Sequence, residues 1–322
     1  MGLVSIALTT YNRSAALKSA VSRILLQTYQ NYEIIIVDDS STDNTFNVVN
    51  NDILLLDSRI KYIRHESNRG LAAARNTAIR SSSGKYFTFC DDDDSWKENF
   101  LEKMVENADN FGPSWCFISG STLSLGKDFL NVVIEFPNMT LRDAIYRGIT
   151  PPVGAQFYFL VDVRGAGEYN ELISSGVDHD LWLRLATNNV NLHCLKECLV
   201  LPNSFPVSDR MTTNVRKRTD GIESSLTLWR SIIEENFGVD FYHHFCDEYR
   251  YYIYRAFIIK AVRARNVKVI TRLVFDFRIF KYFYRLLLDS ISRNSVSILT
   301  VDTFGNKILQ KQSQPSFKSF DR

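Results

Sequence analysis

The sequence predicts an α/β fold in which a mostly parallel sheet is flanked by helices on both faces. Short apolar runs without alternation, such as Ile34-Ile35-Ile36-Val37, recur through the first hundred residues. Such runs are typical of parallel strands that are covered on both faces. The segments between them carry apolar residues at helical spacing, for example Leu17, Val21 and Ile24. Because strand and helix signals alternate, we expect βαβ units and a doubly wound, Rossmann-like sheet.

The elements of this first part are expected in the following order. Strands are predicted at 4–8, 33–37, 60–64 and 86–90. Ser14 is a candidate N-cap for the first helix, and the polar turn at 38–43 opens a second helix that passes Phe46 and Ile53. The turn Asn68-Arg69-Gly70 precedes a third helix at 71–79.

The rest of the chain adds further elements and then changes in character. We expect a helix around 100–105, strands at 115–120 and 132–136, a capping box at 140–143, a loop at 151–155 leading into a strand through Val161, a helix opened by Asp178, and a last strand at 192–201. From about residue 224 aromatic residues recur at helical spacing, and basic residues dominate 263–293. Three parts are therefore predicted: a sheet domain at 1–220, a helical region at 221–304 and a flexible tail at 305–322.

Composition excludes several classes of protein. A chain of 322 residues with 45% hydrophobic and 23% charged residues is ordinary globular material, and a net charge of +2 gives no argument for nucleic acid. The five cysteines form no CxxC pair, which suits a reducing compartment and argues against a zinc site. The first residues lack the features of a signal peptide, and no apolar run is long enough to predict a membrane-spanning helix.

An apolar strand that ends in four consecutive aspartates is the most informative stretch. Residues 86–90 lead directly into Asp91 to Asp94. Adjacent carboxylates repel one another, and their hard oxygens suit Mg²⁺ or Mn²⁺, which take further ligands from phosphate. Ligands of α/β sheets also bind at the carboxyl ends of strands. The stretch therefore predicts a metal that holds a phosphate-bearing substrate, with a solvated acidic turn capping the next helix as the alternative.

Acidic residues occupy comparable positions at two further places, Asp38-Asp39 and Asp178. Together with several short motifs in the same order, this set resembles the family-2 glycosyltransferases with the GT-A fold, over about residues 3–210. The motifs are Val4-Ser5-Ile6, Gln27-Thr28-Tyr29, Tyr32 to Asp43, Asn68-Arg69-Gly70, Ala74-Arg75-Asn76, Asp91 to Asp94 with Trp96, and Asp178 with Asp180-Leu181-Trp182-Leu183-Arg184. Each motif alone is weak, and their common order makes the resemblance specific.

The resemblance implies a nucleotide-sugar site on the first two strand ends. Thr9, Tyr11 and Asn12 would line the nucleotide, with Tyr11 near the base. Asp39 would accept a hydrogen bond from the base, as uracil N3–H offers, although it could instead cap the helix that follows. Asp38 would support the turn.

The resemblance also assigns roles around the diphosphate. Arg75 would reach toward the nucleotide or its phosphates. Asp91 or Asp92 would contact the ribose side, and Asp93 would bind the divalent cation, Mn²⁺ or Mg²⁺, that bridges the diphosphate.

On the acceptor side, Asp178 takes the place of the general base and would accept the proton of the attacking hydroxyl. His179 is expected at the surface or facing the acceptor, and Asp180 as a cap or a support. Trp96 would contact the acceptor sugar, with anchoring of its loop as the alternative. Trp182 is expected in the core.

What the resemblance implies is an inverting, metal-dependent transfer of sugar from a nucleotide donor, with UDP favoured, to a saccharide acceptor. A lipid-linked acceptor of O-antigen or capsule assembly would place the protein in the cytoplasm, peripherally on the inner membrane. Basic, aromatic helices after residue 221 suit such a surface, although they could equally cap the catalytic domain.

Two residues depart from the family pattern: Val177 stands where the family often has Glu, and Ser208 stands where it often has His. The rival hypotheses are a nucleotidyltransferase, which would require a Gly-rich loop in place of 9–12, and a non-catalytic saccharide- or membrane-binding protein that keeps the fold.

Overall fold

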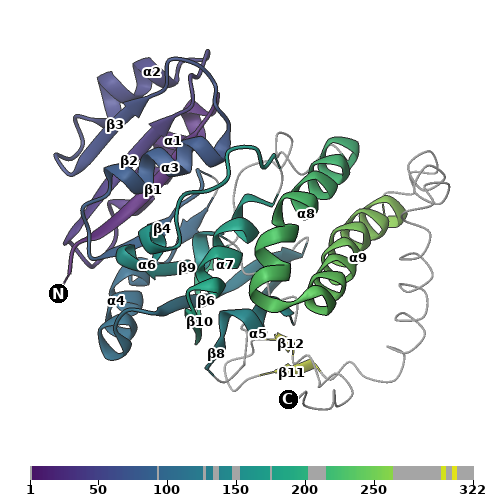
Figure 1. Ribbon diagram of the computed structural model, residues 1–322. Coiled ribbons are helices and arrows are strands. Elements are labelled where there is room, and N and C mark those ends of the chain that lie inside the picture. Colours follow the sequence, from purple (N-terminus) through teal and green to yellow (C-terminus); the bar gives the residue numbers. More distant parts are fainter. Residues whose placement is uncertain are drawn as a thin grey trace.

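The computed structural model describes residues 2–92, 94–125, 128–132, 138–146, 153–174, 176–201, 215–263, 299–301 and 307–309 (Figure 1). Its main feature is one large sheet. The strands are β1 (Val4–Thr10), β2 (Tyr32–Asp38), β3 (Ile60–Arg64), β4 (Tyr86–Phe89), β5 (Ser95–Trp96), β6 (Trp115–Leu125), β7 (Asp128–Val132), β8 (Met139–Thr140), β9 (Gln156–Phe159) and β10 (Asn191–Leu201). A separate short pair is formed by β11 (Leu299–Val301) and β12 (Lys307–Leu309).

The strand order is β3-β2-β1-β4-β9-β6-β10-β5, with β7 beside β6 and β8 beside β10. The pairs among β1, β2, β3 and β4 are all parallel. The neighbour β9 runs antiparallel to both β4 and β6, whereas β6 and β10 are parallel. The mixed α/β architecture with a mostly parallel sheet is therefore confirmed.

Helices cover both faces of this sheet (Figure 1). They are α1 (Ser14–Ile24), α2 (Thr45–Val48) with a π-helical turn (Val49–Ile53), α3 (Leu71–Ser81), α4 (Phe100–Phe111), α5 (Leu141–Tyr146), α6 (Leu160–Gly165), α7 (Val177–Thr187), α8 (Val215–Phe237) and α9 (Val239–Arg263). One core holds Ile35 and Val37 with residues of α3, α7 and α8; a second holds Ile34 and Ile36 with residues of α1 and α4. This division explains why β2 is apolar at these successive positions, since neighbouring side chains enter different cores.

Among the described residues the local expectations hold with two corrections, and 133–136 of the strand expected at 132–136 lie outside those residues. Ser14 is not the N-cap of α1: the cap is Arg13, and the Ser14 N–H donates to the Asp43 carboxylate of the neighbouring loop at 3.2 Å. The strand expected through Val161 ends at Phe159 because residues 160–165 form α6. One half of the expected capping box is confirmed, since the Asp143 N–H donates to Thr140 Oγ1, and the Asp143 carboxylate also accepts the Thr140 hydroxyl.

Residues 215–263 of the C-terminal region form a helical pair that packs on the sheet part. Figure 1 shows α8 and α9 side by side, and Glu223 of α8 accepts hydrogen bonds from Arg250 and Tyr254 of α9. Aromatic residues of α9, among them Phe245 and Tyr249, are buried in the core that contains α7. These helices therefore follow the alternative in which they cap the catalytic part.

Two expectations for this region remain predictions. The division at residue 220 stays a prediction, and the basic segment 264–298 lies outside the described residues. Across the ranges given above, no helix has both the length and the apolar composition that crossing a bilayer requires.

Candidate active site

Three strand ends bring the predicted site residues to one edge of the sheet. In the parallel registers, Thr10 lies opposite Asp38, and Ala7 lies opposite Phe89. The chain therefore leaves β1 toward Tyr11, β2 toward Asp39 and β4 toward Asp91 at the same edge. This is the edge where α/β sheets bind ligands.

Asn12 holds the first two of these loops together. Its backbone has a positive φ of 55°, a conformation that asparagine tolerates better than most residues. Its side-chain oxygen accepts the Thr42 N–H at 2.7 Å and the Asp43 N–H at 3.2 Å. Thr9 is half-buried and Tyr11 is 46% exposed, so Tyr11 presents an aromatic ring at the edge.

Asp38 and Asp39 are both buried and both serve as acceptors. Asp38 accepts the Ser41 N–H and the Tyr62 hydroxyl, each at 2.8 Å, which confirms its support of the turn. Burial, followed by the hydrogen bond to Asp38, raises the pKa of the Tyr62 phenol well above its ordinary value.

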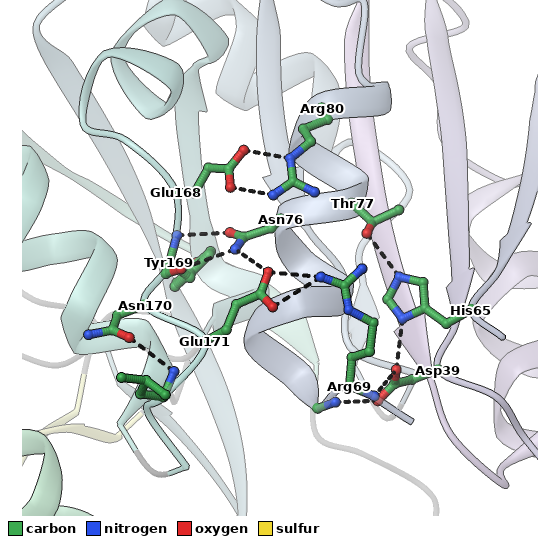
Figure 2. Close-up of polar contacts among 12 residues, drawn as sticks. Asp39, His65, Arg69, Asn76, Thr77, Arg80, Glu168, Tyr169, Asn170 and Glu171 are labelled. Carbon is green, nitrogen blue, oxygen red and sulfur yellow. Dashed lines mark hydrogen bonds and ion pairs between the residues drawn. The ribbon is translucent and has the colours of Figure 1, made fainter. Parts of the chain in front are cut away.

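Asp39 ties the loop before α3 to the end of β2 (Figure 2). Its Oδ1 accepts from His65 Nδ1 and the Arg69 N–H, both at 2.8 Å, and its Oδ2 accepts the Gly70 N–H at 2.7 Å. A carboxylate only accepts, so we assign the proton of His65 to Nδ1, while Nε2 lies 2.9 Å from the Thr77 hydroxyl. The alternative in which Asp39 caps the helix after β2 is therefore wrong. The N–H groups that Asp39 accepts belong to Arg69 and Gly70, which directly precede α3.

Arg75 joins the two halves of the candidate site. It is buried on α3, its Nη1 contacts the Asp178 carboxylate, and its Nη2 lies 3.4 Å from Asp91 Oδ1. Burial alone would lower the pKa of the guanidinium, but the charges of Asp178 and Asp91 outweigh burial, and the pKa lies above its ordinary value. Contact of Arg75 with phosphate stays a prediction, since here its partners are carboxylates.

The acidic run after β4 is a structured turn. The Asp94 N–H donates to the Asp91 carbonyl at 2.8 Å, and the Asp91 N–H donates to Asp94 Oδ2 at 3.2 Å. Asp92 is 3% exposed and pairs with Arg13 at 2.5 Å. The alternative of a solvated cap is wrong, because α4 begins only at Phe100 with Asn99 as its cap residue.

A divalent cation fits this run in part. Asp91, whose side chain is 37% exposed, offers a hard carboxylate oxygen at the sheet edge. Asp93, the predicted metal ligand, lies outside the described residues. Among the residues that are described, no group of three or more His, Cys, Asp or Glu side chains is placed to share a metal ion.

The two residues expected to contact the acceptor, Trp96 and His179, differ in exposure. The Trp96 ring is 6% exposed, stacks on Phe100 at 4.3 Å, and donates from Nε1 to the Gly154 carbonyl at 2.7 Å. Trp96 therefore anchors its loop, and the expected contact with the acceptor sugar is corrected, because the buried ring cannot receive a sugar. His179 is half-buried and packs edge-on against Tyr249 of α9 with ring centroids 4.5 Å apart, and its contact with an acceptor stays a prediction.

The remaining expectations concern Trp182, Val177 and Ser208. Trp182 is buried and donates to Gln156 and Tyr158, which confirms a core role. Val177, the first of the two departures from the family pattern, is buried in the core, and Ser208, the second, lies outside the described ranges.

Arg13 and His65 are site residues that the sequence interpretation missed. His65 directly follows β3, so its place as a polar residue at a strand end was the available signal. Arg13 had no comparable local signal, because its partner Asp92 lies far along the chain.

The fold and the carboxylates at its edge define a glycosyltransferase with the GT-A fold. A family model described as glycosyl transferase family 2 matches residues 5–163. The chain is 31% identical over 199 residues to TuaG of Bacillus subtilis, whose name assigns it to teichuronic acid biosynthesis, covering 61% of this chain and 77% of that protein. This chain belongs to glycosyl transferase family 2.

A second relative is also a glycosyltransferase by name, and two solved structures share the fold. The chain is 42% identical over 104 residues to the Escherichia coli UDP-Glc:alpha-D-GlcNAc-diphosphoundecaprenol beta-1,3-glucosyltransferase WfgD, a match that spans 32% of this chain and 40% of WfgD. S. aureus TarS 1-349 in complex with UDP-GlcNAc has a TM-score of 0.53 at 15% identity, with 99% of each chain covered. The Pyrobaculum calidifontis mannosyltransferase PcManGT with GDP-Man and Mn²⁺ has a TM-score of 0.56 at 15% identity, covering 91% of this chain and 86% of that one.

Proposed function

We propose that this protein transfers a sugar from a UDP-linked donor to a lipid-linked saccharide acceptor, with inversion, during assembly of a bacterial cell-surface polysaccharide such as an O-antigen or capsule. One observation carries the proposal: Arg75 contacts both Asp178 and Asp91. The candidate base and the acidic run thus face a common point, although one begins α7 and the other follows β4.

Asp178 is the proposed general base. Its side chain is 40% exposed, so an acceptor hydroxyl can reach it from the open edge of the sheet. A positioned base accelerates attack by a sugar hydroxyl by roughly 10²–10⁴-fold. One base and one displacement invert the anomeric carbon, whereas retention by double displacement needs a second carboxylate at the sugar.

The donor side rests on Asp39 and on the acidic run. Each carboxylate oxygen can accept two hydrogen bonds, and Asp39 Oδ1 already accepts from His65 and Arg69. Asp39 Oδ2 accepts from Gly70 and offers its second acceptor position to an N–H such as uracil N3–H. Thr9, Tyr11 and Asn12 complete this side, and UDP-Glc in the name of WfgD favours a UDP donor.

A divalent cation belongs beside the diphosphate. Asp93 would hold it, with Asp91 or Asp92 on the ribose side, and the cation would stabilise the charge that develops on the leaving diphosphate. The Mn²⁺ that accompanies GDP-Man in the mannosyltransferase structure supports this choice of metal.

The proposed acceptor is a saccharide carried on a lipid diphosphate. The name of WfgD includes GlcNAc-diphosphoundecaprenol, which favours a lipid diphosphate acceptor and a peripheral position on the cytoplasmic face of the inner membrane. The rival nucleotidyl transfer is disfavoured, because the loop after β1 is tied down by Asn12 and contains no glycine.

The test is an assay of UDP release from a panel of UDP-sugars with Mn²⁺ and a synthetic GlcNAc-diphosphate lipid as acceptor. We expect release with one donor, an inverted product by NMR, and loss of turnover when EDTA removes the metal. Asp178→Asn should lower kcat by roughly 10²–10⁴-fold. A retained anomeric configuration, or near-normal turnover by Asp178→Asn, would contradict the proposal.

A further inference from the structure

A buried carboxylate stands directly behind the candidate base. Asp180 is 1% exposed and accepts three hydrogen bonds. Its Oδ2 accepts the Asn170 N–H at 3.0 Å and Arg184 Nε at 2.9 Å, and its Oδ1 accepts Trp229 Nε1 at 2.8 Å. The donors come from three different places: the α6–α7 connection, the body of α7, and α8.

Asp178 and Asp180 point to opposite sides of the first turn of α7. Residues two apart on a helix are separated by about 200° around its axis. Asp178 accordingly reaches Arg75 on the open side, while Asp180 faces α8 on the buried side. The first turn is thus held from both sides, and its rotation about the helix axis sets where the Asp178 carboxylate stands.

The segment that carries Asn170 is itself fastened to α3, as Figure 2 shows. Asn76 exchanges two hydrogen bonds with the backbone of Tyr169, at 2.8 Å and 3.0 Å. Arg69 pairs with Glu171 at 3.1 Å, and Arg80 pairs with Glu168. Helix α3 therefore carries Arg75, which meets Asp178, and at the adjacent position Asn76, which fixes the peptide that meets Asp180.

The turn before α7 is closely packed against α8 and α9. Gly176 has a φ of 80°, and a Cβ atom there would overlap the Tyr249 hydroxyl and lie 3.0 Å from the Trp229 ring. Helices α8 and α9 are therefore in close contact with the turn that directly precedes Asp178.

We propose that Asp180 is a positioning residue for the transfer reaction. Through Trp229 and Asn170 it sets the rotation of the first turn of α7, and with it the angle at which Asp178 meets the acceptor hydroxyl. On this account α8 does more than cap the sheet part, because its Trp229 helps to hold the carboxylate behind the candidate base. The inference rests on the proposed role of Asp178 as base.

Two variants of the full-length chain test it in the UDP-release assay. Asp180→Asn keeps the shape of the side chain but cannot accept hydrogen bonds at both ends. Trp229→Phe removes one hydrogen bond and keeps an aromatic ring in the core. We expect Asp180→Asn to lower kcat by about 10–100-fold, because displacement of a reacting group by about 1 Å has effects of this size. Trp229→Phe should lower kcat less, and both should leave KM for the donor within about twofold of the wild-type value, since neither residue reaches the nucleotide side.

The matched control is Glu223→Gln, which weakens the contact of α8 with Arg250 and Tyr254 of α9 and leaves Asp180 alone. We expect wild-type kcat from this variant. Thermal unfolding checks that each variant is folded. If Asp180→Asn does not fold, the kcat of Trp229→Phe tests the proposal on its own.

Each result separates the alternatives. Unchanged kcat in folded Asp180→Asn and Trp229→Phe overturns the inference, and so does an equal loss in Glu223→Gln or a parallel rise in donor KM. Asp178→Asn in the same assay separates the two proposals. If Asp178→Asn stays active, the proposed function is wrong; if Asp178→Asn is inactive and the other two are normal, only the positioning role is wrong.

Discussion

Arg75 and Asp178, which are 103 residues apart in the sequence, are in direct contact across the candidate site. The same guanidinium lies 3.4 Å from Asp91 and 4.9 Å from the centre of the Phe89 ring. It is buried, whereas both carboxylates are more than one-third exposed. Arg75 is therefore a fixed cation at the floor of the site, and the two acids are the groups that a substrate can reach.

Replacing Arg75 by Met should separate the two carboxylates. Without the cation, Asp91 and Asp178 repel each other, and a substrate no longer meets both in one geometry. We expect the free energy of unfolding to fall by about 1–3 kcal/mol, a modest loss for a buried charge because both acids also face water. Urea titration measures this loss, and UDP release should fall at least tenfold. Arg75→Lys keeps the charge, so a Lys variant as inactive as the Met variant would show that the two-sided geometry, rather than the charge, matters.

The close approach of Gly154 to Asp94 predicts an effect on the acidic turn. A Cβ atom at Gly154 would overlap the Asp94 carboxylate, so Gly154→Ala must displace that group. We expect a loss of about 1–3 kcal/mol in the free energy of unfolding and a higher Mn²⁺ requirement for UDP release. The control is Gly165→Ala, where a Cβ atom would lie an ordinary 4.0 Å from the Asn188 side chain. Equal behaviour of the two variants would count against a role for the turn in holding metal.

His65 should affect donor binding through Asp39. His65→Ala removes the donor at Asp39 Oδ1 and leaves the carboxylate able to turn away from a base. We expect the affinity for UDP, measured by titration calorimetry, to fall roughly tenfold with kcat nearly unchanged. His65→Asn can still donate from a similar position and should recover part of the affinity. Unaltered UDP binding by His65→Ala would separate His65 from nucleotide recognition.

Glu33 should make stability depend on pH. Burial raises the pKa of Glu33, but hydrogen bonds from Lys61, Ser5 and Ser83 outweigh it, so the pKa in the folded chain lies below the ordinary value of 4.5. A carboxylate with a lowered folded pKa stabilises the fold above its ordinary pKa, and this contribution is lost as the pH falls through the folded value.

Glu33→Gln should accordingly be less stable than the wild type at neutral pH, and the gap should shrink as the pH drops below 4.5. Urea unfolding across this range measures the difference. Glu106→Gln, which alters a largely exposed carboxylate on α4, is the control and should show no such trend. A gap that stayed constant with pH would contradict the assignment.

Local patterns account for what was predicted correctly. The apolar run at 33–37 became β2, because a strand covered on both faces is apolar at successive positions. The Gly-containing turn before α7 was equally visible, and Gly176 does adopt the left-handed backbone that glycine favours. These features depend on neighbours in the sequence, so the sequence displays them.

The partners of the site residues could not be predicted from local sequence patterns. The sequence around Asp39 does not indicate that His65, Arg69 and Gly70 are its hydrogen-bond partners, and the sequence around Asp180 does not indicate Trp229. The same limit applies to Trp96: the resemblance implied a contact with the acceptor sugar, and only the stacking on Phe100 and the hydrogen bond to Gly154 show that the ring anchors its loop.

By itself the sequence determined the alternation of strands and helices, the edge at which the acidic residues gather, and the resemblance to family 2. The tertiary structure alone decided which groups face one another: Arg75 against Asp91 and Asp178, Asp39 against the loop before α3, and Asp180 against α8. The reason is physical. Periodicity and turn chemistry are set by residues within a few positions, whereas ion pairs and buried hydrogen bonds form between segments that only the folded chain brings together.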